Sequence, residues 1–406
     1  MSQTKSTIRP LLTEDLGDFW EMHDEYHPNG ITRQVEWYDN LKIEWPGFSY
    51  HGAYRNNKIV GGMAINDYLL NLRSQIVRLS SVGMVRTDKL HKKEKVCKDM
   101  MEYFIEFNKQ KGINVLTLTA FRPDFYKSMG FGYGSCLYNY RIPPSSFPNK
   151  GTKEFLSYIS QSERKAYNEG YGKVFEKNHG MINGTEQAAW FHQVLEEGVK
   201  RTLAYKEGGV IRGGLAFTSR EREMTIENMF YDDTKVLHAF CSFIHSQADE
   251  FDRVLFSTPD EYFYYLLHDP TNGIAKNECC TSSINNMFRI IDVAGLFNEL
   301  RDVNFNNQNA VIEISIRDTF HSQNSGVTVV EFTNGKVSVC SKQSSGANEN
   351  IKMKIDISDF SSLIMGSINA KALYRLGLLE TSDAGSLDML EKIFTIGQKP
   401  LSVGGL

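Results

Sequence analysis

One order of strands and helices occurs twice along the chain, and this repetition limits how its 406 residues can fold. In the first copy, three strands separated by turns are expected over residues 48–86. Apolar residues then recur every three or four positions over 92–109, which predicts a helix with one buried face. The copy is completed by a short apolar strand at 114–120, a brief helical turn at 122–129 and a final strand at 133–142. The expected order is β-β-β-α-β-α-β.

A weaker copy of this order follows a proline-rich stretch that begins at Pro143 and suits a linker. Its elements are a hairpin at 203–221, a strand at 223–232, an amphipathic helix at 234–250 and a strand at 253–259. Asp232 and Asp233 precede the long helix of this copy, and their charge would repel a diphosphate. The second copy is therefore not expected to bind a nucleotide cofactor.

The pattern changes again from Arg289 onward, where strands are followed by helices over residues 357–394 in an α+β arrangement. A chain of 406 residues exceeds what one hydrophobic core usually supports, which agrees with a division into three parts. The expected domains are residues 1–144, 145–286 and 287–406.

The segment 81–104 carries the most chemical information, because it joins a strand to the long helix of the first copy through a basic turn. His91, Lys92, Lys93 and Lys95 lie where that helix would begin. The start of a helix offers unpaired N–H groups and about half a positive charge, so it holds a phosphate well. Basic side chains at this end oppose the helix dipole unless an anion lies against them. The alternative is a solvated, charged helix start.

With this strand, turn and helix, the sequence resembles the GNAT acetyltransferases, whose fourth strand and following turn hold the pantetheine arm and the diphosphate of coenzyme A. It is more closely similar to the Eis (enhanced intracellular survival) family, and the resemblance spans nearly the whole chain. The resemblance implies an α+β fold in which the GNAT domains are of the α/β type. Residues 1–144 would form a catalytic GNAT domain, 145–286 a degenerate GNAT-like domain, and 287–406 a domain similar to sterol carrier proteins.

By position, the resemblance implies contacts between acetyl-CoA and three short segments. The residues are Val85, Arg86 and Thr87 at the strand end, Lys93, Glu94, Lys95, Val96, Cys97 and Lys98 in the diphosphate loop, and Phe121 and Arg122 after the fifth strand. Two of them depart from the family pattern, because Lys95 stands at a glycine position and Glu94 replaces an arginine. Only glycine reaches left-handed backbone angles at no cost, and Glu94 adds a negative charge. The neighbouring lysines can offset that charge.

The segment FYKSMGF places Tyr126 where the family has a tyrosine ahead of a glycine and an aromatic residue. The resemblance implies that its phenol gives a proton to the departing CoA thiolate, whereas a tyrosine packed at a domain surface is the alternative. The family's C-terminal carboxylate is understood to take the proton of the attacking ammonium, and by position this is the carboxylate of Leu406. The chain ends in Ser-Val-Gly-Gly-Leu rather than in an aromatic residue, so a tail without a catalytic role is the alternative there.

The resemblance implies acetyl transfer from acetyl-CoA to a primary amine, by direct attack and without a covalent enzyme intermediate. The acceptor would be an aminoglycoside-like polyamine, a lysine or a small metabolite. Asp24, Glu25, Trp37 and Tyr38 lie in the segment that covers GNAT acceptor sites, although a solvated helix face or core packing is their more ordinary explanation. A catalytically weak or inactive acyl-CoA-binding protein on the same scaffold is the alternative function, and the altered loop and tail favour it.

Charge and composition limit the other partners of the chain. A formal net charge of -4 gives no general attraction to nucleic acid. No stretch approaches the roughly 18 apolar residues that span a bilayer, and no signal-peptide pattern is present, so a cytoplasmic protein without a membrane partner is expected. The six cysteines lack zinc-ligand spacing, which predicts free thiols and no metal. Family members are commonly hexameric, which implies a homo-oligomer.

Overall fold

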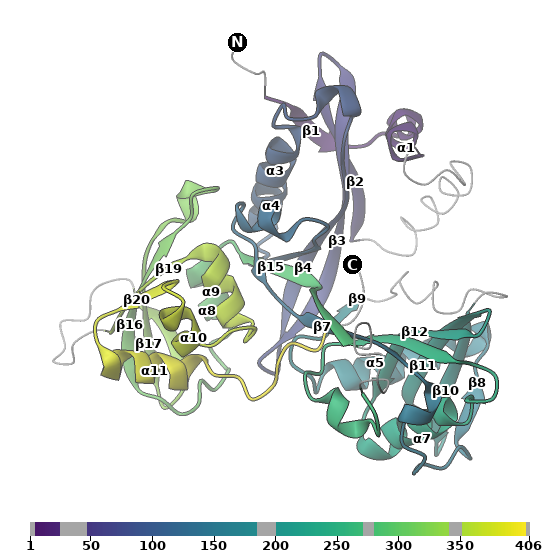
Figure 1. Cartoon of the computed structure of the whole chain (residues 1–406). Coiled ribbons are helices and arrows are strands. Elements are labelled where there is room, and N and C mark those ends of the chain that lie inside the picture. The colour runs from purple at the N-terminus through teal and green to yellow at the C-terminus, as the bar shows by residue number, and fades with distance from the viewer. Residues whose placement is uncertain (1–4, 25–46, 185–199, 271–279, 341–350, 403–406) are drawn as a thin grey trace.

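The computed structural model describes residues 5–24, 47–184, 200–270, 280–340 and 351–402, which form three domains (Figure 1). Each domain is built around its own sheet. Within these described ranges, no helix is long and apolar enough to cross a membrane.

The first sheet is mixed and runs in the order β1-β2-β3-β4-β5-β15-β6, with β9 paired to β3. Its strands are β1 Thr7–Pro10, β2 Phe48–Arg55, β3 Lys58–Leu72, β4 Gln75–Thr87, β5 Val115–Thr119, β6 Gly132–Tyr133, β9 Ile182–Gly184 and β15 Asn286–Ile290. The meander expected over 48–86 is present as β2, β3 and β4. Its two turns are tight because Asn56, Asn57, Arg73 and Ser74 all have positive φ.

Helix α3, Val96–Gln110, covers one face of this sheet. Met100, Met101, Phe104 and Ile105 are buried on its inner side, as the apolar spacing predicts. Gly112, with a φ of 67°, follows the end of this helix. The other helices of the domain are α1 Leu16–Asp24, on the opposite side of the strands, and the short α4 Pro123–Lys127 (Figure 1).

The second sheet runs in the order β14-β7-β13-β12-β11-β10-β8. Its strands are β7 Cys136–Ile142, β8 Leu156–Tyr158, β10 Arg201–Glu207, β11 Val210–Arg220, β12 Glu223–Tyr231, β13 Arg253–Thr258 and β14 Cys280–Ile284. Its helices are α5 Arg164–Phe175 and α7 Thr234–His245. The central meander, the long helix and the parallel strand β13 repeat the order of the first domain.

The two sheets exchange strands, which the sequence did not reveal. The single strand expected over 133–142 is instead divided into β6 in the first sheet and β7 in the second. In return, β15, which follows strand β14 of the second sheet along the chain, lies in the first sheet between β5 and β6. The two segments of the chain lie side by side at this crossing, where Gly134 N donates to Asn286 O at 2.9 Å and Asn285 N donates to Ser135 O at 3.0 Å. The segments 1–144, 145–286 and 287–406 remain our proposed boundaries along the chain, across which these strands are exchanged.

The third domain contains a five-stranded sheet in the order β18-β17-β16-β19-β20. Its strands are β16 Ala310–Arg317, β17 Gly326–Thr333, β18 Lys336–Cys340, β19 Ile351–Asp356 and β20 Leu379–Thr381. Its helices are α8 Val293–Glu299, α9 Ile357–Ile364, α10 Ala370–Arg375 and α11 Ala384–Phe394. Helix α9 contacts both this sheet and β15 of the first sheet.

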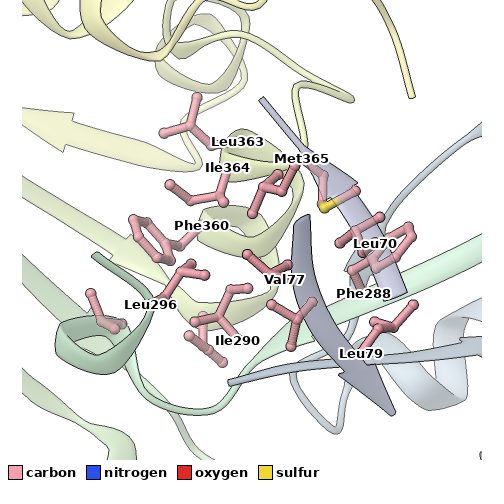
Figure 2. Close-up of a cluster of buried hydrophobic side chains, with 14 of the residues drawn as sticks. Leu70, Val77, Leu79, Phe288, Ile290, Leu296, Phe360, Leu363, Ile364 and Met365 are labelled. Carbon is pink, nitrogen blue, oxygen red and sulfur yellow. The ribbon is translucent and has the colours of Figure 1, made fainter. Parts of the chain in front are cut away.

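The first and third domains share one hydrophobic core (Figure 2). Its side chains come from β3, β4 and β15 on one side and from α8 and α9 on the other. They include Leu70, Val77, Leu79, Phe288, Ile290, Leu296, Phe360, Leu363, Ile364 and Met365. An apolar interface of this kind holds domains in a fixed relation, whereas polar interfaces usually permit motion.

His179 lies where all three domains meet. Its Nδ1 accepts from Arg73 N at 3.1 Å, and its Nε2 lies 3.0 Å from Met365 O. Its carbonyl oxygen accepts from Leu401 N at 2.9 Å. Burial lowers the pKa of His179 to about 4, so the neutral ring is the form that fits these contacts.

We therefore expect the protein to lose stability as the pH falls from about 6.5 towards 4. An unfolded histidine binds a proton below about 6.5, whereas buried His179 does not, so the unfolded state gains protons in this window. The full effect is on the order of 3 kcal/mol, with His51 adding a change of the same sign because burial lowers its pKa to about 4 as well. Unfolding midpoints measured across this range should fall less steeply for His179→Gln than for the wild type. Identical slopes would contradict the assignment.

Candidate active site

The site begins where two parallel strands of the first sheet separate. Strands β4 and β5 pair only at Leu79–Ser81 with Val115–Thr117, although β4 continues to Thr87. Beyond this point β4 also contains a bulge, because Met84 and Val85 face the single residue Met63 on β3. Met84 has a φ of 49°, which a bulge of this kind requires. The strand end, residues 85–87, therefore lies beyond the last β4–β5 pair.

The start of α3 lies directly after this strand end and has no side-chain cap. Lys95 is the N-cap residue, and its side chain makes no capping hydrogen bond. Its φ is 65°, so a lysine holds the left-handed conformation at the position where the family pattern has glycine, and Lys93 has the same φ. The amides of the first helical turn have no partner inside the helix. Uncapped amides, the helix dipole and nearby lysines together suit a bound diphosphate.

Glu94, which the sequence places where an arginine is usual, is neutralised by Arg55 at the end of β2. Arg55 Nη1 lies 2.7 Å from Glu94 Oε2, and Arg55 Nη2 donates to Glu94 O at 2.7 Å. His91 Nδ1 lies 3.0 Å from the same carboxylate oxygen. The negative charge is therefore paired rather than free to repel an anion. Sequence reasoning missed Arg55, because a contact across 39 residues leaves no local pattern.

The backbone strain at Lys95, before α3, can be tested by substitution. A left-handed conformation costs a non-glycine residue roughly 1–2 kcal/mol, so Lys95→Gly is expected to raise the free energy of unfolding by up to about 1 kcal/mol. Lys109→Gly makes the same change inside α3 and should lower the free energy of unfolding by a similar amount. Thermal unfolding of both variants without ligand measures the two signs. A lower midpoint for Lys95→Gly would show that Lys95 is not strained.

Tyr126 lies on α4 with its side chain turned inward. The residue is 3% exposed and meets Phe121, Phe125 and Phe131 edge-on. Burial, followed by the nearby Cys97 thiol, raises the pKa of Tyr126, whereas Arg86 acts in the opposite direction. The hydroxyl therefore lies near both the start of α3 and the end of β4. It makes no hydrogen bond to the described parts of the chain, which leaves its proton available to a ligand.

The other residues expected to contact acetyl-CoA differ in exposure and position. Phe121 is 73% exposed, and Arg122 forms an exposed pair with Asp124 at 2.6 Å. Cys97 is partly buried, and burial raises the pKa of its thiol to about 12. A thiol of that pKa stays protonated near neutral pH, so Cys97 is unsuited to act as a nucleophile. Val85, Arg86 and Thr87 end β4, and Val96 and Lys98 lie in the first turn of α3.

Four of the expected residues lie outside the described residues: Glu25, Trp37, Tyr38 and Leu406. Ser402, four positions before Leu406, is anchored near the gap. Its Oγ accepts from Asn286 Nδ2 at 2.5 Å, and Asn286 Oδ1 accepts from Thr119 Oγ1 at 3.1 Å. Since Thr119 ends β5, the chain is held at the mouth of the separating strands.

The corresponding helix start in the second domain is closed by the protein itself. Asp233 is the N-cap of α7, and its side chain accepts from Val236 N at 3.0 Å. Arg212 pairs with Asp232 at 2.9 Å and with Asp233 at 2.5 Å. These contacts occupy the position that α3 leaves open. Within the described residues, no group of three or more His, Cys, Asp or Glu side chains is placed to hold a metal.

Comparison with protein families defines the class of this fold. Residues 7–134 match a model described as an acetyltransferase (GNAT) domain, and residues 183–290 match another model with the same description. Residues 297–402 match the sterol carrier protein domain. No curated protein matches the chain in sequence.

Solved structures share the whole architecture. A GCN5-related N-acetyltransferase from Anabaena variabilis is 17% identical with a TM-score of 0.82, and a probable N-acyltransferase from Enterococcus faecalis is 14% identical with a TM-score of 0.83. Eis1 from Mycobacterium abscessus is 15% identical with a TM-score of 0.76. Each alignment covers 99% of this chain and 100% of the other. The chain is thus a tandem GNAT protein with a C-terminal sterol carrier domain. Its fold is similar to that of Eis1, in agreement with the resemblance seen in its sequence.

Proposed function

We propose that the first domain transfers an acetyl group from acetyl-CoA to a primary amine by direct attack. The observation that carries this proposal is the start of α3 without a side-chain cap, next to the part of β4 that extends beyond its last pair with β5, with the Tyr126 hydroxyl nearby. The GNAT fold and the Eis-like architecture support acyl transfer in general. An aminoglycoside-like polyamine, a lysine or a small metabolite is the proposed acceptor, and a homohexamer is the proposed assembly.

The residues around the gap fit coenzyme A in a definite order. The amides of residues 95–98 would hold the diphosphate, with Lys93 and Lys98 adding positive charge. The backbone of residues 85–87 would hold the pantetheine arm, because this part of β4 extends past its last pair with β5. Phe121 and Arg122 would border the cofactor on the β5 side. Glu94 is paired with Arg55, which also lies 3.7 Å from the Asp99 carboxylate, so Lys93 and Lys98 supply the net positive charge of this path.

Two proton transfers accompany the reaction. The amine nitrogen attacks the thioester carbonyl, and the C–S bond breaks to release a thiolate. Tyr126 gives its proton to this sulfur, since its raised pKa keeps the hydroxyl protonated at neutral pH. The carboxylate of Leu406 would take the proton from the attacking ammonium. Four residues of extended chain span at most about 14 Å, so this role requires the reacting amine to lie within that distance of Ser402.

Calorimetric titration of acetyl-CoA into the full chain tests the binding step. We expect one site per chain, and at least tenfold weaker binding for Lys95→Asp, which copies the capping residue Asp233 of the second domain. Lys58→Asp makes the same charge change at the start of β3 and should leave binding unaltered. Absence of heat for the wild type would overturn the proposal. Binding without turnover on any amine of a broad panel would favour the inactive binding protein.

The proposed role of the Leu406 carboxylate as the base can be tested separately. Deleting Gly404–Leu406 is expected to lower the turnover number at least tenfold and to leave acetyl-CoA affinity unchanged. Leu406→Ala keeps a terminal carboxylate at the same position and should retain most of the rate. A deletion variant with an undiminished rate would remove the tail from the mechanism.

A further inference from the structure

The second domain contains a cavity at the place where its own parallel strands separate. Strands β12 and β13 pair only at Glu223–Ile226 with Arg253–Phe256, and both strands continue beyond these residues. A cavity of about 100 Å³ lies past the last pair, between residues 228–231 and 256–260. This is the same position in the GNAT fold as the gap between β4 and β5 in the first domain. A strand bulge lies beside each gap.

The wall of this cavity is mainly apolar. Val174, Met181, Ile226, Met229, Phe230 and Phe256 contribute to it. Several of its polar groups already have partners inside the protein. Ser257 Oγ donates to Asn139 Oδ1 at 2.7 Å, and Asn178 Nδ2 donates to Val174 O at 2.7 Å. Asn228, Tyr231, Thr258 and Asp260 are the other polar residues of the lining. Since most of the wall is apolar, an occupant gains mainly by burying apolar surface.

The closed start of α7 excludes a diphosphate from this domain. Asp233 caps the helix, and its carboxylate, together with that of Asp232, faces Arg212. Two acidic side chains stand where a phosphate would need free amides and positive charge. The start of α7 therefore lacks the free amides that a phosphate would need, and the cavity must be judged on its own lining.

We infer that this cavity is a binding site for an uncharged aliphatic chain, such as the alkyl or acyl end of a small molecule. An apolar cavity of about 150 Å³ stays dry and binds benzene, so a volume of about 100 Å³ suits a chain of ~4 carbons. This inference goes beyond the proposed acetyl transfer and does not depend on it. It follows from the fold of the second domain and the chemistry of its wall.

One wall of the cavity belongs to the C-terminal segment. Leu401 lines it, and the next residue, Ser402, is bonded to Asn286 on β15. Asn286 in turn accepts from Thr119 at the mouth of the first domain's gap. The site is thus built from the second domain and from the segment that leads towards the proposed active site.

Ligand-observed NMR titration of the full chain with 1-butanol tests the inference. We expect saturable binding at one site per chain, and at least a tenfold loss of affinity in Ile226→Phe, which fills the cavity. Leu237→Phe enlarges a half-buried side chain of α7 outside the cavity lining and should bind as the wild type does. Unchanged unfolding midpoints confirm that both variants are folded.

A second variant decides the matter if Ile226→Phe does not fold. Leu401→Ala enlarges the cavity and should increase the affinity for 1-hexanol at least threefold relative to 1-butanol. Binding that is not saturable in the wild type would overturn the inference. So would saturable binding that survives Ile226→Phe, or a Leu401→Ala variant with unaltered preference between the two alcohols. These outcomes concern binding alone, so they are independent of whether the chain transfers acetyl groups.

Discussion

Replacing Tyr126 by phenylalanine is expected to lower the turnover number at least about 10²-fold while changing acetyl-CoA affinity less than about twofold. The ring packs among Phe121, Phe125 and Phe131, and phenylalanine preserves these edge-on contacts. Only the hydroxyl is lost, and it supports no hydrogen bond within the described chain. Stability should therefore change little, and the effect should fall on the step in which the thiolate leaves.

The pH dependence of the reaction separates the acid from the base. Burial raises the pKa of Tyr126 above its ordinary value, so the hydroxyl keeps its proton through the neutral range. Any rise in turnover between pH 6 and 9 must then reflect deprotonation of the amine or its base. The turnover of Tyr126→Phe should rise with pH in the same way, from a lower starting rate. Tyr133→Phe, on the half-exposed strand β6, is the matched control and should keep the wild-type rate. Equal turnover in Tyr126→Phe would remove this residue from the mechanism.

The elements that the sequence predicted well are those with local signals. The apolar repeat of 92–109 became α3 at Val96–Gln110, and the meander of 48–86 became β2 to β4. The position of Lys95 was also informative, because the family pattern demanded a left-handed residue there and the structure has one. Lys95 thus adopts the left-handed backbone conformation although it is not glycine, the residue that adopts this conformation at no cost.

Partners across long separations could not be predicted in the same way. The 133–142 segment has strand character, but nothing in its pattern says that β6 and β7 belong to different sheets. Arg55 and Asn286 likewise carry no motif, although one neutralises Glu94 and the other holds Ser402 beside Thr119. The contacts of these residues depend on tertiary pairing, which hydrophobic periodicity and secondary-structure propensity do not encode.

Strand β15 also contributes a buried ion pair to the junction between the first and third domains. Arg289 on β15 and Asp318 after β16 form an ion pair whose side chains are both 0% exposed. Arg289 also donates to Met129 O, three residues before β6 begins at Gly132. Asp318 accepts from His321 N at 2.9 Å and from Asn324 Nδ2 at 3.1 Å. The pair thus joins the first domain to the third at the loop that follows Tyr126.

Arg289→Met is expected to lower the free energy of unfolding by about 3–5 kcal/mol, because it leaves the Asp318 carboxylate buried without its cation. Urea unfolding of the full chain, compared with Arg289→Met/Asp318→Leu, measures this penalty. The double variant removes both charges and should recover a large part of the loss, since replacing a buried pair by apolar groups is often nearly neutral. Arg317→Met, at an exposed pair with Asp356, is the matched control and should change stability by less than about 1 kcal/mol. A double variant no more stable than Arg289→Met would show that the hydrogen bond to Met129, rather than the uncompensated charge, dominates this junction.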